Sequence, residues 1–101
     1  MMPISPQAAP AVDLSRLLRS GAVLLDVRTE QEFAGFHLEG AVNIPFDNLD
    51  DNLETVRQWK RPVIVYSADD QRSYLAATRL RNNGITTYTA GPRDRIIKHS
   101  S

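Results

Sequence analysis

The chain has 101 residues, 42% of them apolar, and its 12 basic and 12 acidic residues cancel to a formal net charge of zero. This composition suffices for one hydrophobic core, and the balanced charge excludes a general attraction to nucleic acid or to anionic membranes. The absence of cysteine excludes disulfides, thiolate metal sites and a sulfur nucleophile contributed by the chain itself.

Residues 1–12 are rich in proline and are predicted to be a flexible lead-in to a single domain over 13–101. The lead-in has neither a basic start nor a long apolar run, and no later stretch approaches the length of a membrane span. The sequence therefore predicts a cytoplasmic protein that binds no membrane.

A short amphipathic helix is predicted over 13–20, with Asp13 as its N-cap and Gly21 as its stop. The apolar run that follows, 22–27, has the length of a strand. Because this run does not alternate with polar residues, it is typical of a strand that is covered on both faces.

Thr29-x-x-Glu32 is a capping box, in which a hydroxyl and a carboxylate satisfy free backbone N–H groups at the start of a helix. Phe33 and Phe36 are expected on that helix. Residues 41–45 then form a second predicted strand, which a proline stops.

The apolar residues Leu49, Leu53 and Val56 recur at helical spacing and predict one face of a helix. Residues 62–66 form the third predicted strand, since they again make a short, largely apolar run.

A longer helix is predicted from Ser73 to Asn83, where a following glycine stops it. The β-rich stretch 85–90 comes next, the pair at 91–92 is expected to turn the chain, and 93–98 are expected to form a last short helix.

Strands separated by helix-length segments predict an α/β fold: a small parallel sheet of four to five strands with helices on both faces. Ligands in such sheets bind beyond the carboxyl ends of the strands, where the polar loop 67–72 is expected. A loop that enters a helix collects unpaired N–H groups and partial positive charge, and Arg72 adds a full charge. The sequence therefore predicts an anion cradle with Ser67 at its base.

Two stretches carry a resemblance to a known family. DVRTEQEFAGFHLEGAVNIP, residues 26–45, resembles the rhodanese signature: D-x-R, an acid four residues after the arginine, an aromatic residue, a histidine, G-A and N-I-P. VYSADDQRS, residues 65–73, resembles the active-site stretch of that family, V-Y-C-x-x-G-x-R-S. With the closing NNGITTYTAGPRDRI, the resemblance covers about residues 13–97 and is greatest for single-domain thiosulfate sulfurtransferases.

The resemblance implies a rhodanese-like fold and a loop cysteine that takes the outer sulfur of thiosulfate as a persulfide and passes it to cyanide or another thiol. Ser67 stands at the position of that cysteine, and Asp70 stands where the family usually has glycine. A hydroxyl cannot form a persulfide and is a poor nucleophile without an adjacent base. An Asp70 carboxylate that faced inward would also oppose the bound anion.

We therefore predict a binding or regulatory module; the alternative is a thiosulfate sulfurtransferase whose nucleophile is replaced by Ser67. The predicted ligand is a small sulfur-containing or other oxyanion, with a thiol or protein partner left open, and neither nucleic acid, metal nor cofactor is expected. The predicted anion-binding loop consists of Ser67, Ala68, Asp69, Asp70, Gln71, Arg72 and Ser73. Structural support is predicted from Asp26, Arg28, Glu32 and His37.

Other interpretations of the same residues stay open. Ser67-x-x-Asp70 also fits a simple turn held by side-chain-to-backbone bonds. The charged trio of Asp26, Arg28 and Glu32 also fits a catalytic role, although the resemblance favours an ion-pair network that supports the fold.

Three further groups are interpreted as structural or surface features. A serine hydrolase would need G-x-S-x-G in place of V-Y-S-A-D, and His37 and His99 are too few for a metal site. A solvated helix face is predicted from Asp47, Asp50, Asp51 and Glu54, and a basic surface end from Arg93, Arg95 and Lys98.

Overall fold

Four parallel strands form the sheet at the centre of this fold, in the order β2-β1-β3-β4. The computed structural model describes residues 14–92. The strands are β1 (Val23–Asp26), β2 (Val42–Asn43), β3 (Val63–Ser67) and β4 (Thr87–Pro92). The helices are α1 (Leu14–Arg19), α2 (Glu30–Gly35), α3 (Leu53–Trp59) and α4 (Asp70–Asn82), with 3₁₀ turns η1 (Phe46–Asn48) and η2 (Asp50–Asn52). The predicted α/β class with a parallel sheet is confirmed, with four strands in the described part of the chain.

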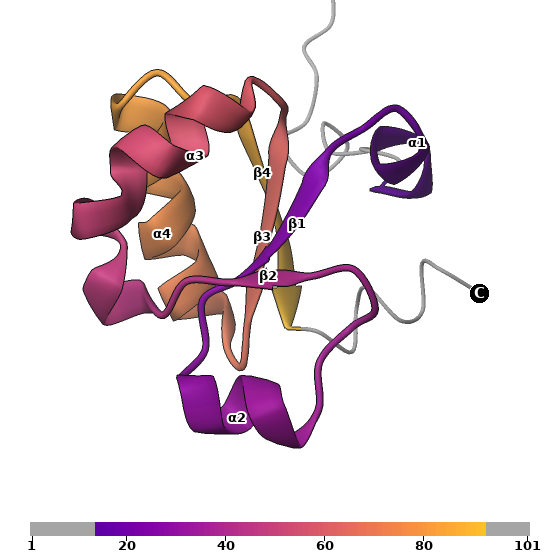
Figure 1. Ribbon diagram of the computed structural model, residues 1–101, viewed down its shortest axis with the longest axis vertical. Helices are drawn as coiled ribbons and strands as arrows, with labels where there is room; N and C mark the ends of the chain where they lie inside the picture. The colour runs from indigo at the N-terminus through magenta and orange to yellow at the C-terminus, as the bar shows by residue number, and fades with distance from the viewer. Residues whose placement is uncertain (1–13, 93–101) are drawn as a thin grey trace, which may run out of the picture.

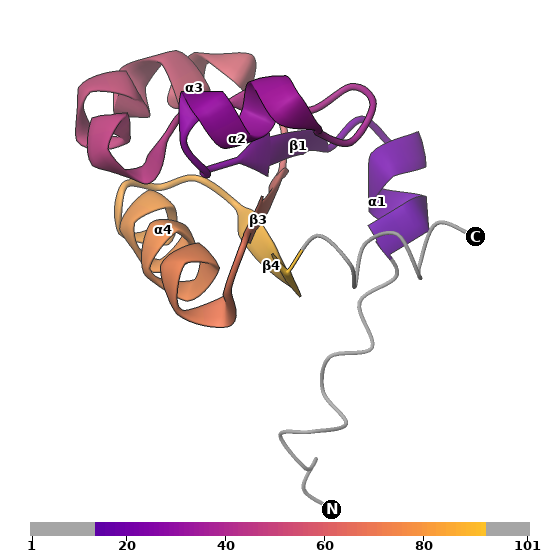
Figure 2. The ribbon, with the colours of Figure 1, turned by 90° about the horizontal axis from the view of Figure 1, so that it is seen from below.

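Helices cover both faces of the sheet (Figures 1 and 2). Along β3, Val63 and Val65 belong to the buried cluster on the side of α3 and α4, whereas Ile64 and Tyr66 belong to the cluster on the side of α1. This alternation follows from the two-residue period of a strand. Burial on both faces explains why the strands are continuous apolar runs in the sequence.

The sequence signals at the end of the first helix and at the start of the second are both found in the structure. Gly21 follows α1 with a φ of +108°, a backbone conformation that glycine adopts without strain. The capping box at α2 is confirmed, because Thr29 and Glu32 each bond the other's backbone N–H. Phe36 was expected on this helix but lies just beyond it in extended conformation, and its carbonyl accepts a hydrogen bond from Arg28.

The segment between β2 and β3 differs from the continuous helix expected around Leu49, Leu53 and Val56. The chain first makes the turns η1 and η2, and the regular helix begins only at Leu53. Leu49, between the two turns, is fully buried. The apolar spacing therefore identified residues that enter the core, but it did not distinguish a 3₁₀ turn from an α-helix.

Helix α4 begins at Asp70 rather than at Ser73, because Asp69 caps it by accepting the backbone N–H of Arg72. The predicted turn at 91–92 is also wrong: both residues extend β4 and pair with the end of β3 after an irregularity in the register. The N-cap expected at Asp13, the helix expected over 93–98 and the basic end lie outside the described residues. Within 14–92, no helix has the length and apolar character needed to cross a bilayer.

Candidate functional site

An open cleft of about 470 Å³ lies at the carboxyl ends of β1, β2 and β3. Parallel strands end at the same edge of the sheet, and this edge is where α/β proteins commonly bind ligands. The cleft is lined from three segments, by Val27, Thr29, Pro45, Phe46, Asp47, Asp69, Gln71, Arg72 and Leu75.

Ser67 closes β3 and is fully buried. Its hydroxyl donates a hydrogen bond to the Asp69 carbonyl, and the Asp69 N–H lies 3.3 Å from the same hydroxyl oxygen. Ser67 is not among the residues that line the cleft. Its hydroxyl therefore holds the short turn between β3 and α4 through the backbone of Asp69.

The carboxylate of Asp69 occupies part of the predicted anion cradle. Its Oδ1 accepts the backbone N–H of Arg72 at 2.8 Å, and the same residue lines the cleft. A helix N-terminus favours negative charge, and at the N-terminus of α4 the Asp69 carboxylate supplies that charge. An external anion would have to compete with Asp69 for that backbone donor.

The remaining loop residues divide between the cleft and the helix. Gln71 and Arg72 line the cleft, whereas Asp70, whose orientation the sequence left open, is the exposed first residue of α4 and does not line it. The acidic residue that reaches the backbone donor is thus Asp69. Ala68 is exposed, and the buried Ser73 donates to backbone carbonyls at the start of α4.

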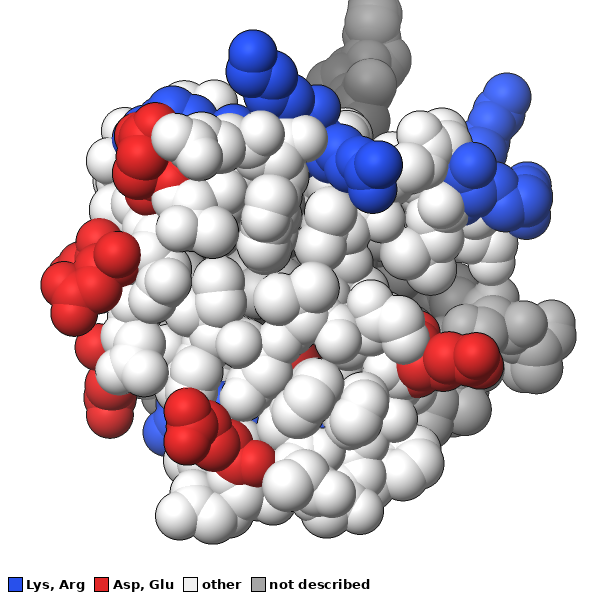
Figure 3. Space-filling view, in the orientation of Figure 1, with Lys and Arg blue, Asp and Glu red and all other residues white. Residues whose placement is uncertain are grey.

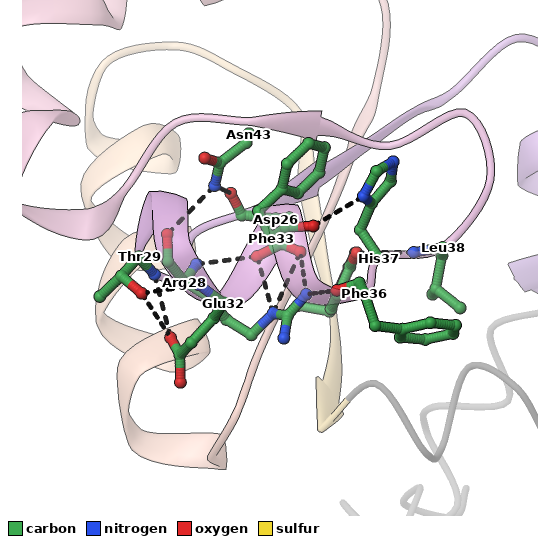
Figure 4. A network of polar contacts seen from close by, with 10 residues as sticks. Asp26, Arg28, Thr29, Glu32, Phe33, Phe36, His37, Leu38 and Asn43 are labelled. Atoms are coloured by element: carbon green, nitrogen blue, oxygen red, sulfur yellow. Dashed lines mark hydrogen bonds and ion pairs between the residues drawn. The ribbon is translucent and has the colours of Figure 1, made fainter.

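A buried ion pair between Asp26 and Arg28 lies beneath the loops at this edge (Figure 4). Arg28 approaches both carboxylate oxygens, with Nε at 3.1 Å from each and Nη2 at 2.8 Å from Oδ2. The Asp26 side chain has no exposed area and that of Arg28 has 6%. The hydrogen bonds to Asp26 raise the pKa of the Arg28 guanidinium above its ordinary value, against the opposing effect of burial.

The ion pair connects three segments of the chain. Arg28 Nη2 donates to the Phe36 carbonyl at 2.6 Å, and the Asn43 amide donates to the carbonyls of Asp26 and Arg28 (Figure 4). Burial, together with a hydrogen bond with Asp26, raises the pKa of Tyr66 to about 12. These contacts fix the ends of β1 and β2, from which part of the cleft is built.

Glu32 and His37 support the fold separately from this ion pair. Within residues 14–92, the Glu32 carboxylate forms no salt bridge with Arg28 and instead completes the capping box. The ring of His37 stacks on Phe33 at 3.7 Å between centroids, and its Nδ1 lies 2.8 Å from the Phe33 carbonyl oxygen. Nδ1 therefore carries the proton.

No basic side chain bonds the Ser67 hydroxyl in the region that the structure describes. The Ser67 hydroxyl bonds the backbone carbonyl and N–H of Asp69, and His37 is bound to the backbone of α2. A serine needs an adjacent base to become a nucleophile. Among the described residues, no group of three or more His, Cys, Asp or Glu side chains is placed to hold a metal ion.

Several lining residues were missed by the sequence reasoning. Val27 and Thr29 follow β1, and Pro45, Phe46 and Asp47 follow β2. The rule that placed the site after β3 applies equally to the ends of neighbouring parallel strands, so it could have identified them. Asp47, predicted on a solvated face, is one of these lining residues.

Comparisons with known proteins identify the family to which this fold belongs. Residues 10–91 match the family described as Rhodanese-like domain. The chain is 45% identical over 65 residues to the uncharacterized protein YqhL of Bacillus subtilis, which covers 64% of this chain and 51% of that protein. The chain thus spans about half the length of that curated relative.

Two solved structures are similar over most of their length. A rhodanese-like domain protein from Staphylococcus aureus has a TM-score of 0.70 at 27% identity, covering 81% of this chain and 82% of that one. A rhodanese with anions from E. coli has a TM-score of 0.65 at 27% identity, covering 71% and 87%. The chain belongs to the rhodanese-like domain family, and it does so without a cysteine.

Proposed function

We propose that this chain is a non-catalytic rhodanese-like module that binds a ligand in the cleft before α4 and does not transfer sulfur. The burial of Ser67, with its hydroxyl bonded to the Asp69 carbonyl, carries this proposal. The residue at the position of the family nucleophile is here a structural part of the turn. No cysteine elsewhere in the chain can replace it.

The proposed ligand is a small oxyanion, such as a sulfur oxyanion, that Arg72 and the first turn of α4 would hold. Arg72 lines the cleft and brings a full positive charge to a helix N-terminus. The similar rhodanese from E. coli was solved with anions, which supports the same ligand class here. Because Asp69 already accepts the Arg72 N–H, we expect the unaltered chain to bind such an anion weakly.

The test is an NMR titration of backbone amides with sodium thiosulfate against sodium chloride at matched ionic strength. Asp69→Ser removes the carboxylate but keeps a hydroxyl that caps α4. We expect this variant to bind thiosulfate about tenfold more tightly, which corresponds to ~1.4 kcal/mol. Asp51→Asn is the matched control, since Asp51 is exposed on η2 and does not line the cleft.

The proposal predicts amide shifts at Gln71 and Arg72 that strengthen in Asp69→Ser and stay unchanged in the control. If thiosulfate shifts no amide of this loop in either variant, the cleft is not an oxyanion site. If Asp51→Asn strengthens binding as much as Asp69→Ser, the effect is one of net charge alone.

The second candidate is a thiosulfate sulfurtransferase whose nucleophile has been replaced. The place of Ser67, at the end of β3 and directly before the turn into α4, favours it, because the rhodanese resemblance puts the nucleophile at this position. A thiol at this place would lie near a helix N-terminus and Arg72, and both lower the pKa of a thiol. Full sulfur-transfer activity in Ser67→Cys would favour this second candidate, whereas slow transfer by this variant would favour the first.

A further inference from the structure

Positive charge gathers at the amino edge of the sheet, opposite the cleft. Figure 3 shows Lys and Arg side chains along the upper edge of this face, over the end of α3, with one group of acidic atoms beside them at the upper left. A hollow of about 200 Å³ lies at this corner, and Arg57, Lys60 and Arg61 contribute to its lining without any acidic residue. The formal net charge of the sequence is zero, yet the folded chain has a basic corner formed by Arg57, Lys60 and Arg61.

Only part of this charge has a structural explanation. Cations at a helix C-terminus are stabilised by the helix dipole, and Arg57 bonds both Glu54 and the Asn83 carbonyl. Lys60 and Arg61 are exposed and form no salt bridge with any residue in 14–92. Their charges are thus presented to solvent at the rim of the hollow.

Lys60 is also the one non-glycine residue with positive φ in the described chain. It ends α3 at φ 55° and ψ 41°, in the left-handed region. Glycine would adopt this conformation at lower cost and is the usual residue at such helix ends. A strained residue is a reason to look for a function at its position, and here the strained residue supplies a positive charge.

An apolar groove adjoins the basic hollow. It measures about 470 Å³ and is lined by Val23, Val42, Trp59 and Arg61. Arg61 lines both hollows. Val42 lies on the edge strand β2 and is 38% exposed. Apolar and basic lining therefore form one continuous surface around the end of α3.

We propose that this surface docks a segment of a partner protein that carries an apolar side chain beside acidic ones. The apolar side chain would enter the groove between Val42 and Trp59, and the acidic side chains would meet Lys60 and Arg61. An isolated phosphate or a nucleic-acid backbone would use the charges but not the groove. The surface lies at the opposite edge from the cleft, so the inference goes beyond the proposed function and is independent of it.

Trp59 provides the readout, since it is the only tryptophan in the chain and lines the groove. The probe is the peptide acetyl-EDLFED-amide, titrated while Trp59 emission is recorded. Two further peptides separate the contributions: acetyl-EDSGED-amide lacks the apolar residues, and acetyl-KRLFKR-amide inverts the charge. A short DNA duplex tests the other polyanion class.

Variants of the corner test the residues themselves. Arg61→Gln should raise the Kd of acetyl-EDLFED-amide about threefold to fivefold, as expected for an exposed charge pair. Lys60→Gly should weaken binding similarly while raising the midpoint of urea unfolding, because it removes the strained residue. Arg19→Gln is the control, since this cation at the end of α1 lines neither hollow, and it should change the Kd less than about twofold.

The proposal expects acetyl-EDLFED-amide to shift Trp59 emission and to bind more tightly than the other two peptides and the DNA. It is overturned if this peptide leaves the emission unchanged up to solubility, or if Arg61→Gln and Arg19→Gln raise the Kd equally. Equal binding of acetyl-EDSGED-amide or of the DNA would show that the corner is a general polyanion site, which also overturns it. Circular dichroism confirms that each variant is folded.

Discussion

Replacing Arg28 by methionine tests the buried ion pair that supports the site. Arg28 makes three side-chain contacts with Asp26 and one with the Phe36 carbonyl, and its side chain is 6% exposed. Arg28→Met keeps much of the volume but leaves the Asp26 carboxylate buried without its cation. Breaking one side of such a pair costs about 3 to 5 kcal/mol, against a total stability of about 5 to 15 kcal/mol for a domain of this size.

The assay is urea unfolding followed by circular dichroism, with Asp26→Asn/Arg28→Met as the matched control. The double variant contains no unpaired buried charge, and the introduced asparagine can still accept the backbone N–H that Asp26 accepts from residue 28. We expect the double variant to lose about half as much stability as the single variant. A loss below about 1 kcal/mol in Arg28→Met would refute the structural role of the pair. A loss in the double variant as large as that in Arg28→Met, or larger, would show that the two charges do not act together.

Three further predictions concern single side chains. Glu32→Ala should lower the free energy of unfolding by about 1 to 2 kcal/mol through loss of the capping box, and an unchanged urea midpoint would contradict this. The folded-state pKa of Tyr66, about 12, lies above its ordinary value of 10.0, so the protein should lose up to ~2.7 kcal/mol of stability as pH rises from about 9 to about 13. Tyr66→Phe should flatten this slope, and an equal slope would exclude Tyr66 as its source. Ser67→Cys should transfer sulfur from thiosulfate slowly, and Ser67→Cys/Asp69→Ser about tenfold faster, a difference of ~1.4 kcal/mol in the barrier; equal thiocyanate production would show that Asp69 does not oppose the anion.

Local signals in the sequence predicted local structure well. The capping box needs only Thr29 and Glu32, which lie in the same turn of chain, and the structure contains it. Apolar runs located the strands because burial on both faces leaves a continuous pattern. The start of α4 was misplaced because Asp69 and Ser73 both fit a cap, and only the backbone geometry shows that Asp69 accepts the Arg72 N–H.

Features that depend on tertiary structure could not be read in this way. The sequence left open whether the Asp70 carboxylate faces the anion, because side-chain direction at the first residue of a helix depends on where that helix begins. The sequence did not indicate the basic corner, because acidic residues elsewhere in the chain balance the charges of Lys60 and Arg61 in the net charge. Trp59 and Val42, far apart in the chain, line one groove only because the fold brings the end of α3 and the edge strand β2 to the same hollow.

The central claim is that this rhodanese-like domain binds a small oxyanion without transferring sulfur. Treatment with thiosulfate tests this claim most directly. The purified chain is incubated with thiosulfate and examined by intact-protein mass spectrometry, and thiocyanate is measured after cyanide is added. The account predicts an unchanged protein mass and thiocyanate no higher than in a heat-denatured sample, because Ser67 cannot hold a persulfide and is buried in its own turn. A protein mass increased by one sulfur atom, or thiocyanate above that control, would contradict it.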